Sequence, residues 1–242
     1  MPTSPNPSLA SPTASKPFLP LYLADEIWLD ILIHCSYGAL KTLERVCMKL
    51  QRLTKSPNLD SLLFRAPPLA KRLSATQRVG LHPLLARLNP VNLTPDRAFF
   101  PPSPSSSPPS SAGTPSTAPR SVDAYRLKAA HEYATSPACT TLAFDVDGRG
   151  LLSISHRSGV RVRRVLKSIG TYLASKPSPA VAVCAIRLGW EKDWQDLTLA
   201  DMLGLLSDTT RWSGWEAPRV GHDGGVVLIN RGRASNLPSF VV

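Results

Sequence analysis

Two aspartates with the potential for phosphoryl chemistry, Asp145 and Asp147, precede Gly148 in the middle of the chain. A carboxylate at the end of a strand can attack a phosphoryl group, and a second acid nearby can act on the leaving group. Residues 141–146 alternate between apolar and polar types, which predicts a strand that ends at these aspartates. Asp-Gly is also a frequent hairpin turn, and residues 152–155 alternate again, so the same pattern predicts a β-hairpin.

The run Asp145-Val146-Asp147-Gly148 resembles the nucleophile motif of haloacid-dehalogenase-like phosphatases. Arg149 stands where that family has a threonine, and the lysine and paired acids that the chemistry needs do not follow at suitable spacing. A turn is therefore the preferred interpretation of these residues. Phosphatase activity is the weakest of the alternatives.

The cysteines and histidines offer no better site. The four cysteines form no CxxC pair and have no histidine at metal-ligand spacing, which favours a reduced compartment over a disulfide framework. No serine lies in a GxSxG context that a histidine could serve. We expect no catalytic, cofactor-binding or metal-binding residue. These cysteines are Cys35, Cys47, Cys139 and Cys184.

Positive charge suggests a different kind of partner. The chain has 28 basic and 17 acidic residues, a formal net charge of +11. A dense basic cluster together with several tryptophans is compatible with a nucleic-acid surface. On a helix, however, the intervening aliphatic residues would face inward and the arginines would lie on the solvated face, so nucleic-acid binding is an alternative that we do not favour. The cluster is Arg157, Arg161, Arg163, Arg164 and Lys167, and the tryptophans are Trp190, Trp194, Trp212 and Trp215.

Proline is concentrated in two stretches, residues 1–20 and 101–119, which are also rich in serine. Such segments lack the apolar surface needed to offset the entropy lost on ordering, so we expect both to be disordered or polyproline-like. The longest apolar run, residues 180–186, is too short to span a membrane, and residues 1–20 lack the basic start and apolar run typical of a signal peptide. We expect a soluble intracellular protein of the cytoplasm, the nucleus or both.

The elements with the clearest periodicity are near the amino terminus. Leu23, Ile27, Ile31, Leu32 and Cys35 recur at helical spacing and predict one apolar stripe. A second stripe predicts a single helix over residues 40–53, and Ser56-Pro57 predicts the start of a third, short helix. Three helices in about 45 residues rarely bury all their apolar side chains by themselves, so we expect another surface to cover part of the stripe. The second stripe comprises Leu40, Leu43, Val46, Cys47, Leu50 and Leu53.

Residues 23–63 resemble an F-box, the helical module by which substrate receptors bind the Skp adaptor of SCF ubiquitin ligases. The resemblance is carried by Leu23-Ala24-Asp25-Glu26-Ile27, Ile31-Leu32, Leu40 and Leu43, Val46-Cys47, and Ser56-Pro57-Asn58-Leu59. Ala24 replaces the usual proline, and Leu50 and Asp60 stand where tryptophans are common. The resemblance implies a non-catalytic adaptor that links a client protein, through the Skp-type protein, to a cullin. The residues expected to form or support the adaptor interface are Leu23, Ala24, Ile27, Leu32, Leu40, Leu43, Val46, Cys47 and Leu50.

The rest of the chain predicts mixed strands and helices. Besides the hairpin, we expect a short helix after His82-Pro83, a helix over residues 162–173, a buried strand over 181–186 and a strand over 226–229. Thr198 and Asp201 have the spacing of a capping box. This half is similar, more faintly, to a fungal domain of unknown function found alone or after F-boxes. The residues that carry this similarity are His82-Pro83-Leu84-Leu85, Ser158-Gly159-Val160, Leu203-Gly204 and Arg211-Trp212-Ser213-Gly214-Trp215.

The expected fold class is α+β, with a small three-helix module followed by a mixed domain. The expected organisation is a Pro/Ser-rich tail over residues 1–20, an F-box-like module over 21–66, a C-terminal α+β domain over 67–100 and 120–236, a Pro/Ser-rich insert over 101–119, and a tail over 237–242.

Overall fold

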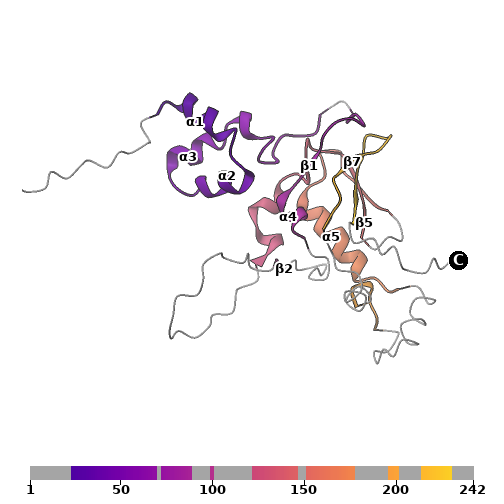
Figure 1. Ribbon diagram of the computed structural model, residues 1–242. Coiled ribbons are helices and arrows are strands. Elements are labelled where there is room, and N and C mark those ends of the chain that lie inside the picture. Colours follow the sequence, from indigo (N-terminus) through magenta and orange to yellow (C-terminus); the bar gives the residue numbers. More distant parts are fainter. Residues whose placement is uncertain are drawn as a thin grey trace, which may run out of the picture.

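The structure is a computed structural model that describes residues 23–69, 72–88, 99–100, 122–146, 151–177, 196–201 and 214–230. Short helices form the N-terminal part, and strands and helices mix in the remainder, so the expected α+β class is confirmed (Figure 1). The Pro/Ser-rich stretches, the predicted strand at 181–186 and the tail at 237–242 lie outside the described residues.

Residues 23–66 form a helical module that contains the helices α1 (Asp25–Leu32), α2 (Tyr37–Leu43) and α3 (Met48–Leu53) and the 3-10 turn η2 (Pro57–Leu59). The side chain of Ser36 caps α2 by accepting a hydrogen bond from the N–H of Ala39. Pro57 occupies the first turn of η2, where its missing N–H and fixed φ cost nothing.

The single helix that the sequence predicted over residues 40–53 is two helices. The chain turns at residues 44–46, and Cys47 is extended, with φ −157° and ψ 163°. The apolar periodicity continues through this break because both helices turn leucines toward one core, so the period alone could not reveal the interruption. The core residues of the module are Leu32, Leu40, Leu50, Leu53, Leu59 and Leu63.

The C-terminal region is built around a four-stranded sheet with the order β6-β5-β8-β7. The predicted hairpin is confirmed, because β5 (Thr141–Asp145) pairs antiparallel with β6 (Leu152–Ser155). On its other side β5 pairs in parallel with β8 (Val226–Ile229), which forms a second antiparallel pair with β7 (Arg219–Val220). The sheet therefore joins segments more than 80 residues apart.

Two shorter pairings lie outside this sheet. Strand β1 (Gly80–Leu81) pairs with β4 (Thr135–Ser136), and β2 (Phe99–Phe100) pairs with β3 (Val122–Asp123). The segment between β3 and β4 forms the two 3-10 turns η4 (Ala124–Arg126) and η5 (Lys128–His131). Asp123 begins η4 by accepting a hydrogen bond from the N–H of Tyr125.

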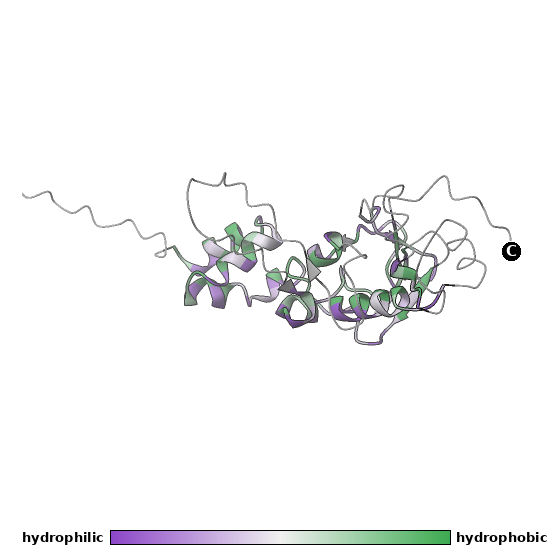
Figure 2. Ribbon diagram, turned by 90° about the horizontal axis from the view of Figure 1, so that it is seen from below, coloured by the Kyte–Doolittle hydropathy of each residue, from purple (hydrophilic) through white to green (hydrophobic). Residues whose placement is uncertain are grey.

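Helix α5 (Val162–Leu173) lies where the sequence predicted it and supplies much of the C-terminal core. Its aliphatic side chains pack with those of β5 and β8, whereas Arg163, Arg164 and Lys167 are exposed. Figure 2 shows the resulting alternation of hydrophobic and hydrophilic residues along the described helices. The central packing residues are Val162, Val165, Leu166, Ile169 and Leu173 from α5 with Leu142, Phe144, Val226 and Leu228 from the sheet.

Two further predicted signals are confirmed at helix starts. His82 precedes the short helix α4 (Pro83–Ala86), and its Nδ1 accepts a hydrogen bond from the N–H of Leu84. Thr198 and Asp201 form reciprocal capping contacts. Oδ2 of Asp201 accepts the N–H of Thr198 at 3.1 Å, and Oγ1 of Thr198 accepts the N–H of Asp201 at 3.2 Å. Over the described residues, no helix is both long and apolar enough to cross a membrane.

Candidate functional site

Apolar side chains on α1 and just before it are exposed to solvent, next to the exposed Glu26 and Asp30. Ile27 and Ile31 are one turn apart on α1 and lie along one side of the helix, and Leu23 immediately precedes the N-cap residue Ala24. The exposed fractions of Leu23, Ile27 and Ile31 are 41%, 48% and 43%. Leu32 is the next residue around the helix, about 100° from Ile31, and it is fully buried in the core of the module. The predicted stripe is therefore divided. Leu32 is buried, Cys35 is partly buried against the core, and the other three residues, called here the α1 outer face, are exposed: Leu23, Ile27 and Ile31.

Two more exposed apolar side chains flank Cys47 between α2 and α3. Val46 is 64% exposed and Met48 is 79% exposed, whereas Cys47 packs against the core of the module. The turn at residues 44–46 ends α2 before Val46 could join the buried side of that helix. The same break that divides the predicted helix thus places Val46 and Met48 in solvent.

The nine residues expected at the adaptor interface do not lie on one surface. Leu23, Ala24, Ile27 and Val46 are exposed, and Leu43 and Cys47 are partly buried against the core. Leu32, Leu40 and Leu50 are buried within the module, where they can support a binding surface without contacting a partner. Ile31, Ile33 and Met48 were not among the nine, yet all three are exposed. For Ile31 the signal was available, because it follows Ile27 by one helical turn.

An ion pair fixes the start of α1 on α3. Asp25 Oδ1 lies 3.2 Å from Nζ of Lys49, and Asp25 Oδ2 lies 2.6 Å from Nη2 of Arg52. The hydrogen bond from Lys49, helped by the charge of Arg52, holds the pKa of Asp25 below its ordinary value. Lys49 Nζ also donates to the carbonyl of Leu23 at 2.6 Å, which positions the first residue of the α1 outer face.

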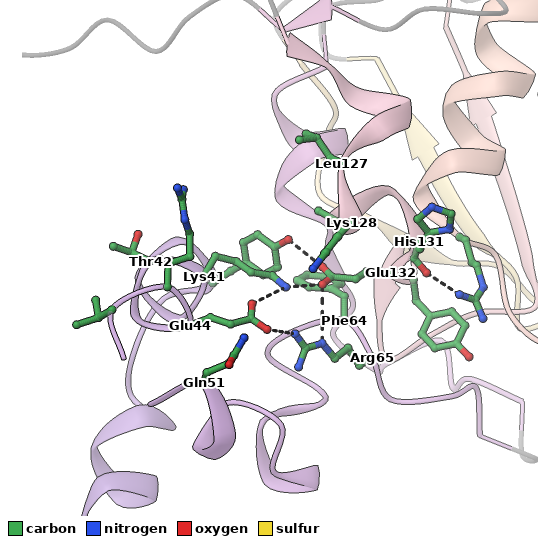
Figure 3. Close-up of a pocket in the computed structure, with 16 residues that line it drawn as sticks. Lys41, Thr42, Glu44, Gln51, Phe64, Arg65, Leu127, Lys128, His131 and Glu132 are labelled. Atoms are coloured by element: carbon green, nitrogen blue, oxygen red, sulfur yellow. Dashed lines mark hydrogen bonds and ion pairs between the residues drawn. The ribbon is translucent and has the colours of Figure 1, made fainter. Parts of the chain in front are cut away.

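Glu132 is the centre of a second polar cluster, which joins the helical module to the C-terminal region (Figure 3). Its Oε1 accepts a hydrogen bond from Nζ of Lys41 at 2.6 Å and lies 3.8 Å from Nε of Arg65. Its Oε2 accepts from the hydroxyl of Tyr37 at 2.8 Å. Tyr37 and Lys41 are one turn apart on α2, so one face of that helix supplies both donors.

His82 supplies a further donor to Glu132. Because Nδ1 of His82 accepts the N–H of Leu84, the ring proton lies on Nε2, 3.1 Å from Oε2 of Glu132. The His82 ring is fully buried and lies edge-on to Tyr37 and Phe64, with ring centroids 5.0 and 4.8 Å away. The imidazole is thus held by packing as well as by hydrogen bonds.

The backbone beside the cluster is fixed by the same residues. Phe64 has a φ of 55°, in the left-handed region that often ends a helical turn, and the N–H of Arg65 returns to the carbonyl of Asp60 at 2.7 Å. The carbonyl of Phe64 accepts the N–H of Tyr133 at 2.8 Å. The N–H of Val162 binds the carbonyl of Glu132 at 3.0 Å, which ties the cluster to the start of α5.

The electrostatics of the cluster favour an anionic Glu132. Burial opposes its ionisation, but the hydrogen bonds from His82, Lys41 and Tyr37 outweigh burial and hold the pKa of Glu132 below its ordinary value. Burial, followed by the charge of Glu132, raises the pKa of Tyr37 well above its usual range. Since several donors already engage both carboxylate oxygens, Glu132 is suited to anchoring these side chains and poorly suited to accepting a proton from a substrate.

A pocket of about 1080 Å³ opens beside the Glu132 cluster. One wall is formed by α2, the following turn and residues 64–65, and the other by residues 127–133 with Arg161 (Figure 3). The lining residues are Tyr37, Lys41, Thr42, Glu44, Arg45, Val46, Gln51, Phe64, Arg65, Leu127, Lys128, Ala129, His131, Glu132, Tyr133 and Arg161. No local pattern in the sequence signalled this pocket, because its walls come from segments about 90 residues apart.

The residues considered for other chemistry are dispersed. Asp145 ends β5, whereas Asp147 lies outside the described residues. The basic cluster of α5 is exposed, but Trp215, the tryptophan of the aromatic set that the structure describes, is buried and donates from Nε1 to the carbonyl of Leu85 at 3.0 Å. Within the described part of the chain, no three His, Cys, Asp or Glu side chains are grouped so as to hold a metal ion.

No protein-family model, curated protein or solved structure matches this chain.

Proposed function

We propose that this chain is an F-box-type adaptor, in which the helical module binds a Skp-type protein and the C-terminal region engages a client. Ubiquitin would reach the client through the chemistry of the ligase partners. In this role the chain contributes proximity and orientation, and no catalytic residue of its own. The setting that this function requires is the cytoplasm or the nucleus, with a cullin recruited through the Skp-type protein.

The observation that carries the proposal is the α1 outer face. The module already has a complete core of leucines, yet Leu23, Ile27 and Ile31 remain in solvent beside it. Full burial of one such aliphatic side chain is worth about 1.5–3 kcal/mol. Because these side chains are 41–48% exposed, a partner that covers them gains part of that value from each, and helix-in-groove recognition uses anchors at the spacing of Ile27 and Ile31.

The connection between the module and the C-terminal region also suits an adaptor. The Glu132 cluster, the bond between Tyr133 and Phe64, and the donation from Ser136 Oγ to the carbonyl of Ser61 at 2.7 Å all join the two. A client held by the C-terminal region would therefore keep a defined position relative to the adaptor. Transfer of ubiquitin to a client benefits from such fixed geometry because the reacting groups are then held near one another.

The proposal is tested by co-expression of the full chain with a Skp-type protein, followed by affinity purification of the tagged chain. Ile27→Asp and Ile31→Asp each place a charge on the α1 outer face, and we expect each to abolish co-purification. Leu151→Asp is the matched control, since Leu151 is 58% exposed in the C-terminal region. Thermal denaturation of each variant checks that the chain remains folded.

Retention of the Skp-type protein by folded Ile27→Asp and Ile31→Asp variants would contradict the proposal. So would the complete absence of binding by the unmodified chain in this assay. The alternative of nucleic-acid binding rests on the exposed basic residues of α5. It predicts instead that the partners recovered with the chain are lost after ribonuclease treatment and are unaffected by either substitution on α1.

A further inference from the structure

The pocket beside the Glu132 cluster carries an excess of positive charge. Its lining includes five basic side chains and two carboxylates, an excess of three positive charges with His131 counted as neutral. The basic residues come from both walls, so the charge surrounds the opening. They are Lys41, Arg45, Arg65, Lys128 and Arg161, and the carboxylates belong to Glu44 and Glu132.

Only part of this charge is compensated within the described residues. Lys41 and Arg65 are each paired with both Glu44 and Glu132. Arg45 and Lys128 are exposed, and neither has an acidic partner among the residues that the structure describes. The two carboxylates are therefore satisfied from within the chain, while cations on opposite walls remain available to an incoming anion.

Arg161 provides a third, partly organised cation. Its Nη1 donates to the carbonyl of His131 at 2.7 Å, and its guanidinium lies over the Tyr133 ring, 5.4 Å from the centroid. These two contacts hold the Arg161 side chain among the residues that line the pocket. An arginine oriented in this way has further N–H groups that can bind a carboxylate or a phosphate.

We propose that this pocket binds an acidic segment of another protein, whose side-chain carboxylate or phosphate lies among Arg45, Lys128 and Arg161. Concave walls concentrate the field of like charges and attract an anion. Charge-assisted hydrogen bonds to guanidinium and ammonium groups then hold it. Apolar lining residues, including Val46 and Leu127, accommodate the side chains next to the acidic one.

The mixed charge of the lining favours a peptide over a nucleic acid. A nucleic-acid strand presents a phosphate at every nucleotide and is bound along an extended basic groove, with bases stacked on accessible aromatic rings. Here Glu44 and Glu132 lie within the pocket and would repel a second or third phosphate, and the Tyr133 ring is already faced by Arg161. A peptide can place one or a few anions at the basic rim and present neutral groups to the carboxylates.

This inference does not rest on the proposed adaptor function. The residues of the α1 outer face do not line the pocket. Val46 lines the pocket and was also expected at the adaptor interface, so a Val46 substitution could not distinguish adaptor binding from peptide binding. Ile27→Asp changes only the α1 outer face, and substitutions at Arg45 and Lys128 change only the pocket, so these variants test the two proposals separately.

The test is fluorescence anisotropy with the purified full chain and labelled nine-residue Gly/Ser peptides. One peptide carries three consecutive aspartates, a second carries one phosphoserine, and a third carries three asparagines. The pocket variant is Arg45→Gln/Lys128→Gln. The control is Arg78→Gln/Lys176→Gln, which removes the same charge at exposed positions away from the pocket. A labelled single-stranded oligouridylate of similar length is measured in parallel.

We expect at least one acidic peptide to bind more tightly than the asparagine peptide, and its affinity to fall roughly tenfold in the pocket variant. The control variant and Ile27→Asp should retain the affinity within about twofold. Comparison of the aspartate and phosphoserine peptides identifies which anion the pocket prefers. Equal binding of the neutral peptide, an equal loss in the control variant, or tighter pocket-dependent binding of the oligouridylate would each overturn the proposal.

Discussion

The Nζ atom of Lys41 lies 2.6 Å from Oε1 of Glu132, although the two residues are 91 positions apart in the chain. Lys41 belongs to α2 of the helical module, and Glu132 lies between η5 and the start of α5. The contact is only partly exposed, so water screens it less than it would screen a surface pair. Together with the bonds from Tyr37 and His82, it makes Glu132 the main polar connection between the module and the C-terminal region.

Removal of the Glu132 charge should weaken this connection. Glu132→Gln keeps the shape of the side chain but leaves the partly buried Lys41 and Arg65 with Glu44 as their acidic partner. Loss of one member of a buried ionic cluster costs about 3 kcal/mol. We expect a decrease of about that size in the free energy of unfolding, measured by urea denaturation.

The matched control for this change is Glu216→Gln. Glu216 pairs with Arg219, which is 70% exposed, so its loss should alter the free energy of unfolding by less than about 0.5 kcal/mol. Equal effects of the two substitutions would show that the Glu132 cluster contributes no more than a surface ion pair.

The same carboxylate should make the stability depend on pH. Because the pKa of Glu132 is lower in the folded chain than its ordinary value of 4.5, the unfolded chain binds the proton more readily. The contribution of Glu132 to the free energy of unfolding is therefore fully present above about pH 4.5, and it is lost as the pH falls through the folded-state pKa of Glu132. Urea denaturation of the unmodified chain and of Glu132→Gln between about pH 3 and pH 6 should give a smaller acid-dependent decrease for the variant. Parallel pH profiles would exclude Glu132 as a source of that decrease.

Core and outer-face residues of the module should respond differently to truncation. Leu32→Ala removes a fully buried side chain and should lower the free energy of unfolding by about 3 kcal/mol. Ile27→Ala removes a side chain that is 48% exposed and should cost less than about 1 kcal/mol. Thermal denaturation of the two variants provides the comparison. A larger loss for Ile27→Ala would mean that the α1 outer face is covered within the isolated chain.

Gly159 is required beside the pocket for steric and conformational reasons. Its φ is +93°, and a Cβ there would lie 2.6 Å from Cε1 of Tyr133, the ring that faces Arg161. Gly159→Ala should lower the free energy of unfolding by about 2 kcal/mol. Gly38→Ala is the control, because a Cβ at Gly38 has no neighbour within 4 Å and alanine favours the helix. Similar destabilisation of both variants in thermal denaturation would contradict the requirement for glycine at position 159.

Local signals predicted several elements correctly. The alternation around residues 141–145 and 152–155 indicated the β5–β6 hairpin, and the spacing of Val162, Val165 and Ile169 indicated α5. These features depend on near neighbours: the period of the side chains, a turn and a cap. The helix predicted over residues 40–53 was wrong for the complementary reason, since two helices that share a core keep one apolar period through the turn between them.

The candidate site was less accessible from sequence. Periodicity grouped Leu23, Ile27, Ile31 and Leu32 in one apolar stripe. It could not predict that Leu32 is buried in the core while the other three are exposed. That division depends on how α1 packs against α3 and on the core that Leu32 shares with the rest of the module. The pocket and its basic residues had no local signal, because Arg45 and Lys128 line one cavity only when the module rests on residues 127–133.

The amino-acid sequence by itself determined the α+β class, the apolar periodicity of the N-terminal helices and the excess of basic residues, since each follows from residue types and short-range spacing. Only the tertiary structure decided which leucines are buried and which isoleucines remain exposed. It also decided that Glu132 accepts hydrogen bonds from Tyr37, Lys41 and His82. The physical reason is that burial and ion pairing depend on distances in space, which chain folding sets between residues that share no local pattern.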